Sequence, residues 1–176
     1  MIHTVVDSPL GPLTLVADDE GRLAGLYMEA QRYRPSEERF GASVVVPRPD
    51  AAPTPAEAVL AETATQLREY FAGTRRSLDV PQAPLGTDFQ RRVWDVLARI
   101  PYGETRTYAQ VADQVGSPTA VRAVGSAIGR NPLCVVVPCH RVVGSGGALT
   151  GYAGGLERKR RLLDLEHPGT GKRSTS

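Results

Sequence analysis

The chain has 176 residues, of which 41% are hydrophobic and 23% charged, and its formal net charge is +2. This composition is ordinary for a soluble globular protein of one domain or two small ones. No apolar run approaches the roughly 18 residues of a membrane helix, and the N-terminus lacks the pattern of a secretory signal. The two cysteines, Cys134 and Cys139, are too few for a disulfide framework, so we expect a reducing, cytoplasmic compartment.

The charge is unevenly distributed along the chain. Residues 1–86 carry 8 basic and 12 acidic side chains, a net charge of −4, whereas residues 87–176 carry 13 and 7, a net charge of +6. This segregation favours a polyanion facing the second half, although a solvated basic helix would explain part of it.

Residues 2–28 are expected to form a β-meander, because short apolar-rich runs alternate there with turns. The expected strands cover residues 2–6, 13–17 and 23–28. Residues 29–53 carry several prolines and little periodicity, so we expect a loop with one possible strand at 43–46.

A long helix is predicted after Thr54, which can cap it, with Pro55 at the first helical position and Glu57 completing a capping box. Its apolar residues recur at helical spacing up to Gly73 and indicate a face that packs in the core. They are Val59, Leu60, Ala64, Leu67, Tyr70 and Phe71. Residues 77–86 are expected to form a short strand and a proline-bearing linker.

The second half is predicted to be mainly helical. A capping box at Thr87 opens a helix that extends to about Arg99. Two shorter helices, expected at 108–114 and 117–128, are joined at Gly116 and form a helix-turn-helix pattern. Such a pair can bind DNA or can serve packing alone, and the pattern by itself leaves both interpretations open.

The second helix of this pair combines small side chains with one long cation, Arg122. Small side chains let a helix approach a narrow groove closely, and an arginine can be inserted there. A tightly packed core helix with Arg122 in a salt bridge would explain the same composition. Both interpretations remain open on this observation.

Residues 133–137 form an apolar run that predicts a buried strand leading into the segment PCHRV at 138–142. Glycine-rich segments within 144–155 follow, and they could let backbone groups face a ligand. The last helix is expected at 156–166, and we interpret its basic run, Arg158 to Arg161, as a solvated face.

Cys139 followed directly by His140 is the candidate reactive pair. A cysteine reacts as thiolate and needs a proton acceptor nearby, but adjacent residues on an extended chain point apart, so a water would have to bridge them. On its own the pair fits a buried structural cysteine, a redox-sensing DNA-binding regulator, or a hydrolase with Glu166 or Asn131 orienting the imidazole. The spacing fits no zinc module, and no metal or cofactor is expected.

Several ordered motifs together resemble the O6-alkylguanine-DNA alkyltransferases, also called methylated-DNA–protein-cysteine methyltransferases. They are PCHRV at 138–142, FQRRVW at 89–94, IPYGET at 100–105, RAVG at 122–125, NP at 131–132 and GYAGGL at 151–156. The resemblance covers residues 87–166 densely. It implies single-turnover transfer of an alkyl group from guanine O6, and from thymine O4, in DNA to Cys139, after minor-groove binding and base flipping.

The resemblance also implies catalytic roles for individual residues. Cys139 is the nucleophile, His140 is its base through a water, and Glu166 orients and charges that histidine. Asn131 braces the site by hydrogen bonds. Tyr108 protonates or polarises the leaving guanine and helps rotate the backbone of the lesion.

The resemblance further implies how DNA and the flipped base are held. Arg122 enters the base stack in place of the flipped nucleotide. The other implied DNA-binding residues are Ala120, Val121, Ala123, Gly125 and Ser145, and the implied pocket residues are Val142, Tyr152 and Ala153. The Ala153 N–H would bond guanine O6, and the Cys139 and Val142 carbonyls would accept from its exocyclic amine. Cys134 has no implied role and is expected to be a small core residue.

The expected fold class is α/β. By the resemblance, residues 1–80 form a ribonuclease-H-like sheet-plus-helix domain, and residues 87–167 form a mainly helical, winged-helix-like domain that contains the helix-turn-helix. Residues 81–86 are the expected linker, and residues 168–176 are expected to be a flexible tail. The expected partner is double-stranded DNA containing O6-alkylguanine, with no membrane and no obligate protein partner.

Overall fold

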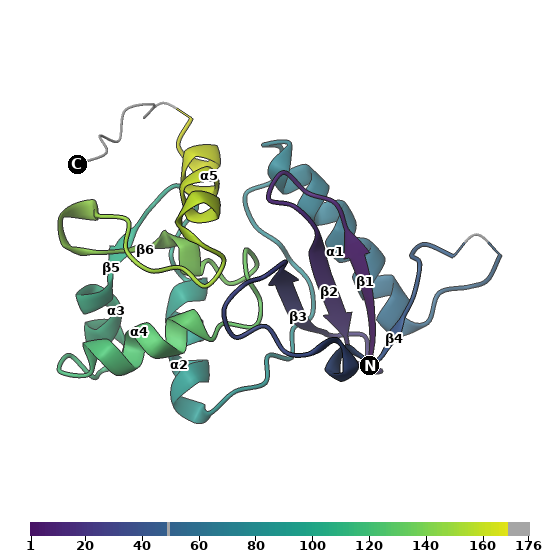
Figure 1. The fold of residues 1–176 in the computed structure, drawn as a ribbon, viewed down its shortest axis with the longest axis horizontal. Coiled ribbons are helices and arrows are strands. Elements are labelled where there is room, and N and C mark those ends of the chain that lie inside the picture. The colour runs from purple at the N-terminus through teal and green to yellow at the C-terminus, as the bar shows by residue number, and fades with distance from the viewer. Residues whose placement is uncertain (49, 169–176) are drawn as a thin grey trace.

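The computed structural model describes residues 1–48 and 50–168, so the tail predicted at 168–176 lies outside the described residues except for Pro168. Figure 1 shows a sheet with one long helix beside a group of shorter helices, with the two halves of the chain lying side by side. This arrangement confirms the predicted α/β class. Within the described part of the chain, no helix is long and apolar enough to cross a membrane.

The N-terminal sheet has the strand order β3-β2-β1-β4. Its first three strands are the predicted antiparallel meander, β1 (Ile2–Val6), β2 (Leu13–Ala17) and β3 (Leu23–Met28). Every residue of β2 is buried, because α1 packs on one face and a small cluster with Phe40 covers Val16 on the other. The sheet is therefore covered on both sides at its centre.

The segment 29–53 departs from the predicted loop. It contains a short 3-10 helix, η1 (Glu37–Phe40), and the strand β4 (Ala42–Ser43), which pairs in parallel with β1. The strand predicted at 43–46 is therefore wrong beyond its first residue. The last ladder bond runs from Val44 N to His3 O, and Pro47 offers no N–H that could extend the pairing.

Helix α1 (Pro55–Phe71) confirms the predicted helix and its capping box. In the linker region, residues 77–86 do not form the predicted strand. They make a single bridge to the sheet, with Leu23 N donating to Pro81 O (2.7 Å) and Ala83 N donating to Leu23 O (2.9 Å). Prolines at 81 and 84 remove the N–H donors that a longer ladder would require.

Four helices and a two-stranded parallel sheet build the second half. They are α2 (Asp88–Ala98), α3 (Tyr108–Val115), α4 (Val121–Gly129), α5 (Leu156–Glu166), β5 (Arg106–Thr107) and β6 (Val142–Val143). The predicted helix-turn-helix is α3 and α4, with Gly116 in the left-handed conformation at the end of α3. Helix α4 begins four residues later than predicted, because Ala120 N donates to Ser117 O and closes a turn instead.

The strand predicted at 133–137 is also wrong. Only Leu133 bridges to the sheet, Val135 has a φ of +71°, and Val137 N donates to Leu133 O across a turn. The side chain of Asn131 holds this turn from inside, donating to Val137 O (2.9 Å) and accepting from Leu133 N (3.0 Å). The apolar run at 133–137 can therefore form a buried loop, because the Asn131 amide provides hydrogen bonds for backbone groups that a strand would have paired.

A continuous core joins the two halves. Its buried residues come from the meander and from α1, α2, α3, α4 and α5. Backbone bonds reinforce the junction, with Leu26 N donating to Pro132 O and Cys134 N donating to Leu26 O. This places the loop that precedes Cys139 against the end of β3.

Candidate active site

A pocket of about 340 Å³ opens beside α4, and Cys139 contributes to its wall. Its other lining residues are Arg32, Tyr33, Tyr108, Gly125, Ser126, Ile128, Gly129, Gly151, Tyr152 and Ala153. An adjacent cleft of about 280 Å³ lies between the sheet and α4, and no cysteine or histidine occurs among the described residues that line it. We therefore place the chemistry in the pocket with Cys139.

Cys139 begins the 3-10 helix η2 (Cys139–Arg141) and is only 4% exposed. The Cys134 thiol, which donates to Gln31 Oε1 (3.5 Å), and the Asn131 amide hold the pKa of Cys139 below its usual value despite burial. The neighbouring Cys139 thiol, together with burial, raises the pKa of Cys134 well above its usual value. Cys134 is buried as predicted, but it also stabilises the Cys139 thiolate, which we had not expected.

His140 is fully buried, and its Nε2 lies 2.8 Å from Oε1 of Glu166. An ionised carboxylate only accepts hydrogen bonds, so Nε2 must carry the proton and Nδ1 must be the free acceptor. Among the described residues Nδ1 has no hydrogen-bond partner. Burial lowers the pKa of His140 despite the nearby carboxylate, so the imidazole is neutral and can accept a proton at neutral pH.

Glu166 is the centre of a buried network that the sequence did not reveal in full. It accepts from Arg141 Nε (2.9 Å) and Nη2 (2.8 Å), from the Tyr70 hydroxyl (2.7 Å), and from His140. Against the cost of burial, the hydrogen bonds from His140 and Arg141 depress the pKa of Glu166 far below its usual value. Tyr70 packs in the core as predicted, and its hydroxyl also braces the carboxylate, a contact that the sequence did not indicate.

Lys159 is a second residue that sequence reasoning missed. The basic run was interpreted as a solvated face, yet Lys159 is 0% exposed and its Nζ donates to the carbonyls of Thr150 and Gly151 (both 3.1 Å). Burial lowers its pKa to about 8, and its charge in turn favours the Cys139 thiolate. The helical period held the signal, because position 159 shares a face with Leu162 and Leu163.

Arg158 also departs from a solvated face. Its guanidinium donates to the carbonyls of Leu10 (3.1 Å), Glu29 (2.8 Å) and Gly154 (3.2 Å). It therefore connects α5 to the β1–β2 turn, to the residue that follows β3, and to the glycine loop. Arg160 and Arg161 are exposed and pair with Glu157, as a solvated face requires.

Tyr108 lies at the start of α3, where the Thr107 side chain caps the helix. Its side chain lines the pocket, and its hydroxyl donates to Thr150 O (2.9 Å). Burial raises its pKa, so the hydroxyl keeps its proton. To reach a bound base, this donor must exchange the loop carbonyl for the ligand.

The predicted pocket residues are only partly brought together. Tyr152 and Ala153 line the pocket, whereas Val142 is fully buried in β6 outside the lining. The Tyr152 hydroxyl is buried without a hydrogen bond of good geometry among the described residues, yet it lies close enough to favour the Cys139 thiolate. Ala153 O accepts from Arg32 N (2.8 Å), which ties the glycine loop to the segment after β3.

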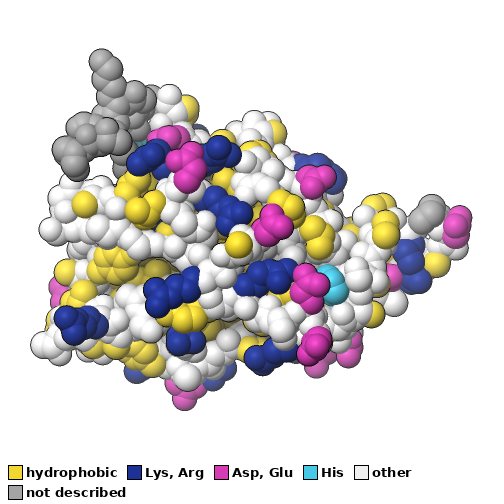
Figure 2. All heavy atoms as spheres, in the orientation of Figure 1, with side chains coloured by type: hydrophobic (Ala, Val, Ile, Leu, Met, Phe, Trp, Pro, Cys, Tyr) yellow, Lys and Arg dark blue, Asp and Glu magenta, His cyan; other side chains and the backbone are white. Residues whose placement is uncertain are grey.

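Helix α4 presents the face expected for DNA. Val121, Arg122 and Ala123 are exposed, and Ala120 and Gly125 are half-buried. Within the described part of the chain Arg122 forms no ion pair, which argues against the alternative of a core helix held by a salt bridge. Figure 2 shows Lys and Arg side chains spread across this face of the helical half. Ser145 is exposed in the 3-10 helix η3 (Ser145–Gly147), apart from the pocket.

The described residues contain no cluster of side chains with the composition of a metal site. Across residues 1–48 and 50–168, no group of three or more His, Cys, Asp or Glu side chains could hold a metal ion. The side chains at the pocket offer a thiol with a lowered pKa and a neutral imidazole.

A thiol of lowered pKa beneath a helix-turn-helix is typical of one class, a DNA-binding protein that carries out covalent chemistry at its own cysteine. Residues 1–84 match the family described as 6-O-methylguanine DNA methyltransferase, ribonuclease-like domain, and residues 88–168 match its DNA binding domain. The chain belongs to this family, the methylated-DNA–protein-cysteine methyltransferases, and the predicted family and enzyme class are confirmed.

Individual relatives agree over nearly the whole chain. The methylated-DNA–protein-cysteine methyltransferase of Mycobacterium tuberculosis is 48% identical over 167 residues, covering 94% of this chain and 93% of its own. The constitutive enzyme of Bacillus subtilis is 46% identical over 165 residues, covering 93% and 94%. The crystal structure of Mycobacterium tuberculosis OGT in complex with DNA superposes with a TM-score of 0.80 at 45% identity, covering 96% of this chain and 94% of that one.

Proposed function

We propose that this chain repairs O6-alkylguanine, and thymine O4 adducts, in double-stranded DNA by moving the alkyl group to Cys139. The observation that carries the assignment is the buried Cys139 thiol of lowered pKa in the wall of a pocket beneath α4. The thiolate attacks the alkyl carbon, the carbon–O6 bond breaks, and its electron pair stays with guanine. The product is a thioether, so each molecule reacts once.

His140 is proposed to take the thiol proton through a bridging water. Its Nδ1 is the unoccupied acceptor, and Glu166 opposite can stabilise the imidazolium that forms. No hydrogen bond joins Cys139 and His140 directly among the residues described, which supports a bridged transfer. Asn131 supports the reacting turn by holding residues 133–137 in place.

Guanine is a better leaving group when it gains a proton, and Tyr108 is the proposed donor. Its hydroxyl points at the glycine loop, which also offers the Ala153 N–H for guanine O6. The Cys139 carbonyl already accepts from Val142 N, and its second lone pair is available to the exocyclic amine. Tyr152 packs at the same wall, and the Val142 carbonyl is proposed as the second acceptor.

DNA is proposed to bind along the exposed face of α4 in the minor groove. Small side chains allow close approach, and Arg122 fills the stack when the damaged nucleotide turns into the pocket. The contact set proposed with Arg122 is Ala120, Val121, Ala123, Gly125 and Ser145. We propose 1–80 and 87–167 as the two domains, 81–86 as the linker, and the cytoplasm as the compartment, where thiols remain reduced.

The test is to mix the protein with duplex DNA containing O6-methylguanine and to measure the mass of the protein and of its Cys139 peptide. We expect one added methyl group on that peptide and no second turnover. Cys139→Ala should bind the duplex but gain no mass, with Cys134→Ala as the matched control that still reacts. Methylation of Cys134, or repeated turnover, would refute the assignment.

A further inference from the structure

Tyr33 is a pocket residue that belongs to the N-terminal half. It lies in the segment after β3 and lines the same pocket as Cys139. Its φ is +63°, in the left-handed region where a bulky residue is unfavourable. Strained positions of this kind cluster at functional sites, so the position invites a functional explanation.

The ring of Tyr33 is held in place from several sides. The guanidinium of Arg130 stacks on it at 4.2 Å from the ring centroid, and that of Arg32 lies at 4.8 Å. A side chain at Gly129 would contact the ring at 3.7 Å, so the ring lies directly against the end of α4. Arg32 N also donates to Ala153 O, which fixes the segment to the glycine loop. Tyr33 is 42% exposed, so these contacts hold in place a ring that is only partly buried.

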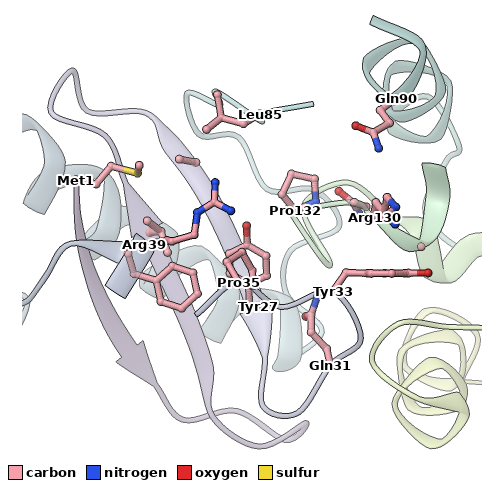
Figure 3. Close-up of a pocket in the computed structure, with 15 residues that line it drawn as sticks. Met1, Tyr27, Gln31, Tyr33, Pro35, Arg39, Leu85, Gln90, Arg130 and Pro132 are labelled. Carbon is pink, nitrogen blue, oxygen red and sulfur yellow. The ribbon is translucent and has the colours of Figure 1, made fainter. Parts of the chain in front are cut away.

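Tyr33 also separates two cavities. Together with Gly129 it lines both the Cys139 pocket and the neighbouring cleft between the sheet and α4. Figure 3 shows its side chain reaching from the segment after β3 toward the helical half, beneath Arg130. Removing the ring would join a pocket of about 340 Å³ to a cleft of about 280 Å³.

We propose that Tyr33 sets the bulk of the O6 substituent that the pocket accepts. The inference rests on the alkyl transfer proposed above, because it concerns the adduct that reaches Cys139. A methyl group fits beside the thiol whatever stands at position 33. An arylmethyl group needs room beyond the thiol, and the clamped ring limits that room on the side of the sheet.

The substitution series follows from the backbone. Tyr33→Gly removes the ring and suits the left-handed φ, Tyr33→Trp enlarges the wall, and Tyr33→Phe keeps the ring as the matched control. Single-turnover rate constants are measured on two duplexes that differ only in carrying O6-methylguanine or O6-benzylguanine. Tyr33→Gly should raise the benzyl-to-methyl ratio of rate constants about tenfold, Tyr33→Trp should lower it, and Tyr33→Phe should leave it unchanged.

The benzyl-to-methyl ratio of rate constants distinguishes a steric role of Tyr33 from a role in DNA docking or in the fold. If both rate constants fall by the same factor, Tyr33 acts on DNA docking or on the fold, and the steric role is overturned. A ratio that stays constant across Tyr33→Gly and Tyr33→Trp overturns it as well. Failure of the wild-type protein to react with either duplex would instead refute the proposed function, so the two failures are distinguishable.

Discussion

The network behind the Cys139 thiol and the surface of α4 beside it are built in opposite ways. Behind the thiol, Glu166 accepts four hydrogen bonds from His140, Arg141 and Tyr70, and all of these side chains are buried. On α4, Arg122 is exposed and forms no ion pair in the part of the chain that the structure describes.

This difference suggests that the buried network serves the reaction at the thiol, whereas the surface of α4 serves the binding of DNA. A buried carboxylate that already satisfies three side chains cannot be altered without leaving a charge unpaired, so its loss should affect both the fold and the reaction. An exposed arginine contributes little to the fold and is free to engage DNA. A substitution behind the thiol should therefore slow the reaction with free O6-benzylguanine and with duplex DNA alike. A substitution on α4 should slow only the reaction with duplex DNA.

The largest effect is expected from Glu166→Gln. Arg141 and His140 would lose their anionic partner in a buried site, and we expect a loss of about 3 kcal/mol in the free energy of unfolding. The imidazolium would also lose its counter-charge, and the rate constant should fall on the order of 10²-fold with both duplex DNA and free O6-benzylguanine. Urea unfolding and single-turnover kinetics measure the two effects.

Glu157→Gln is the matched control, because Glu157 lies on the same helix but is exposed and, among the described residues, pairs only with Arg160 and Arg161. Its effect on stability should stay below about 1 kcal/mol. Equal losses in the two variants would contradict the buried network as the source of the effect.

The next effect is expected from Arg122→Ala, and it should depend on the substrate. Repair in a duplex should slow about tenfold, because nothing would fill the stack left by the flipped nucleotide. The reaction with free O6-benzylguanine should be unchanged, since Arg122 is not among the residues that line the pocket. Arg91→Ala, an exposed arginine on α2, serves as the control. Equal slowing of the reaction with both substrates would contradict a role of Arg122 in base flipping.

A graded effect is expected on lowering the pH. The pKa values of His140 and Glu166 are both lower in the folded protein than their usual values of 6.5 and 4.5. The unfolded state then binds more protons, so stability is full above the unfolded pKa and is lost as the pH falls. The urea midpoint should drop first below about pH 6.5 and again below about pH 4.5. A midpoint that is constant from pH 7.5 to 5.5 would contradict a neutral, buried His140.

Local signals predicted much of this fold from the sequence. The meander, the capping boxes at Thr54 and Thr87, and the helix-turn-helix were found because each depends on neighbours within a few residues. The strand predicted at 133–137 failed because the Asn131 side chain satisfies that backbone, a choice that the apolar pattern does not record.

The family resemblance likewise implied that Cys139, His140 and Glu166 form one site, and the structure brings His140 and Glu166 into contact. It could not identify Tyr70, which meets Glu166 from 96 residues away, because only the tertiary fold brings the end of α1 to the end of α5. Cys134 was misjudged for a similar reason. Five residues before Cys139, it returns beside that thiol only because the intervening chain forms a loop rather than a strand.

The smallest effect is expected from Cys134→Ala, and it tests the side of the thiol opposite the Glu166 network. Because the nearby Cys134 thiol is the largest cause that lowers the pKa of Cys139, removing it should raise that pKa. The reaction with O6-benzylguanine should then slow by a few-fold at neutral pH and recover as the pH rises, since the thiolate is the nucleophile. Cys134→Ser keeps a donor at the same place and should retain most of the wild-type pH profile. A Cys134→Ala profile that superposes on the wild type would show that the Asn131 amide and Lys159 suffice to hold the thiolate.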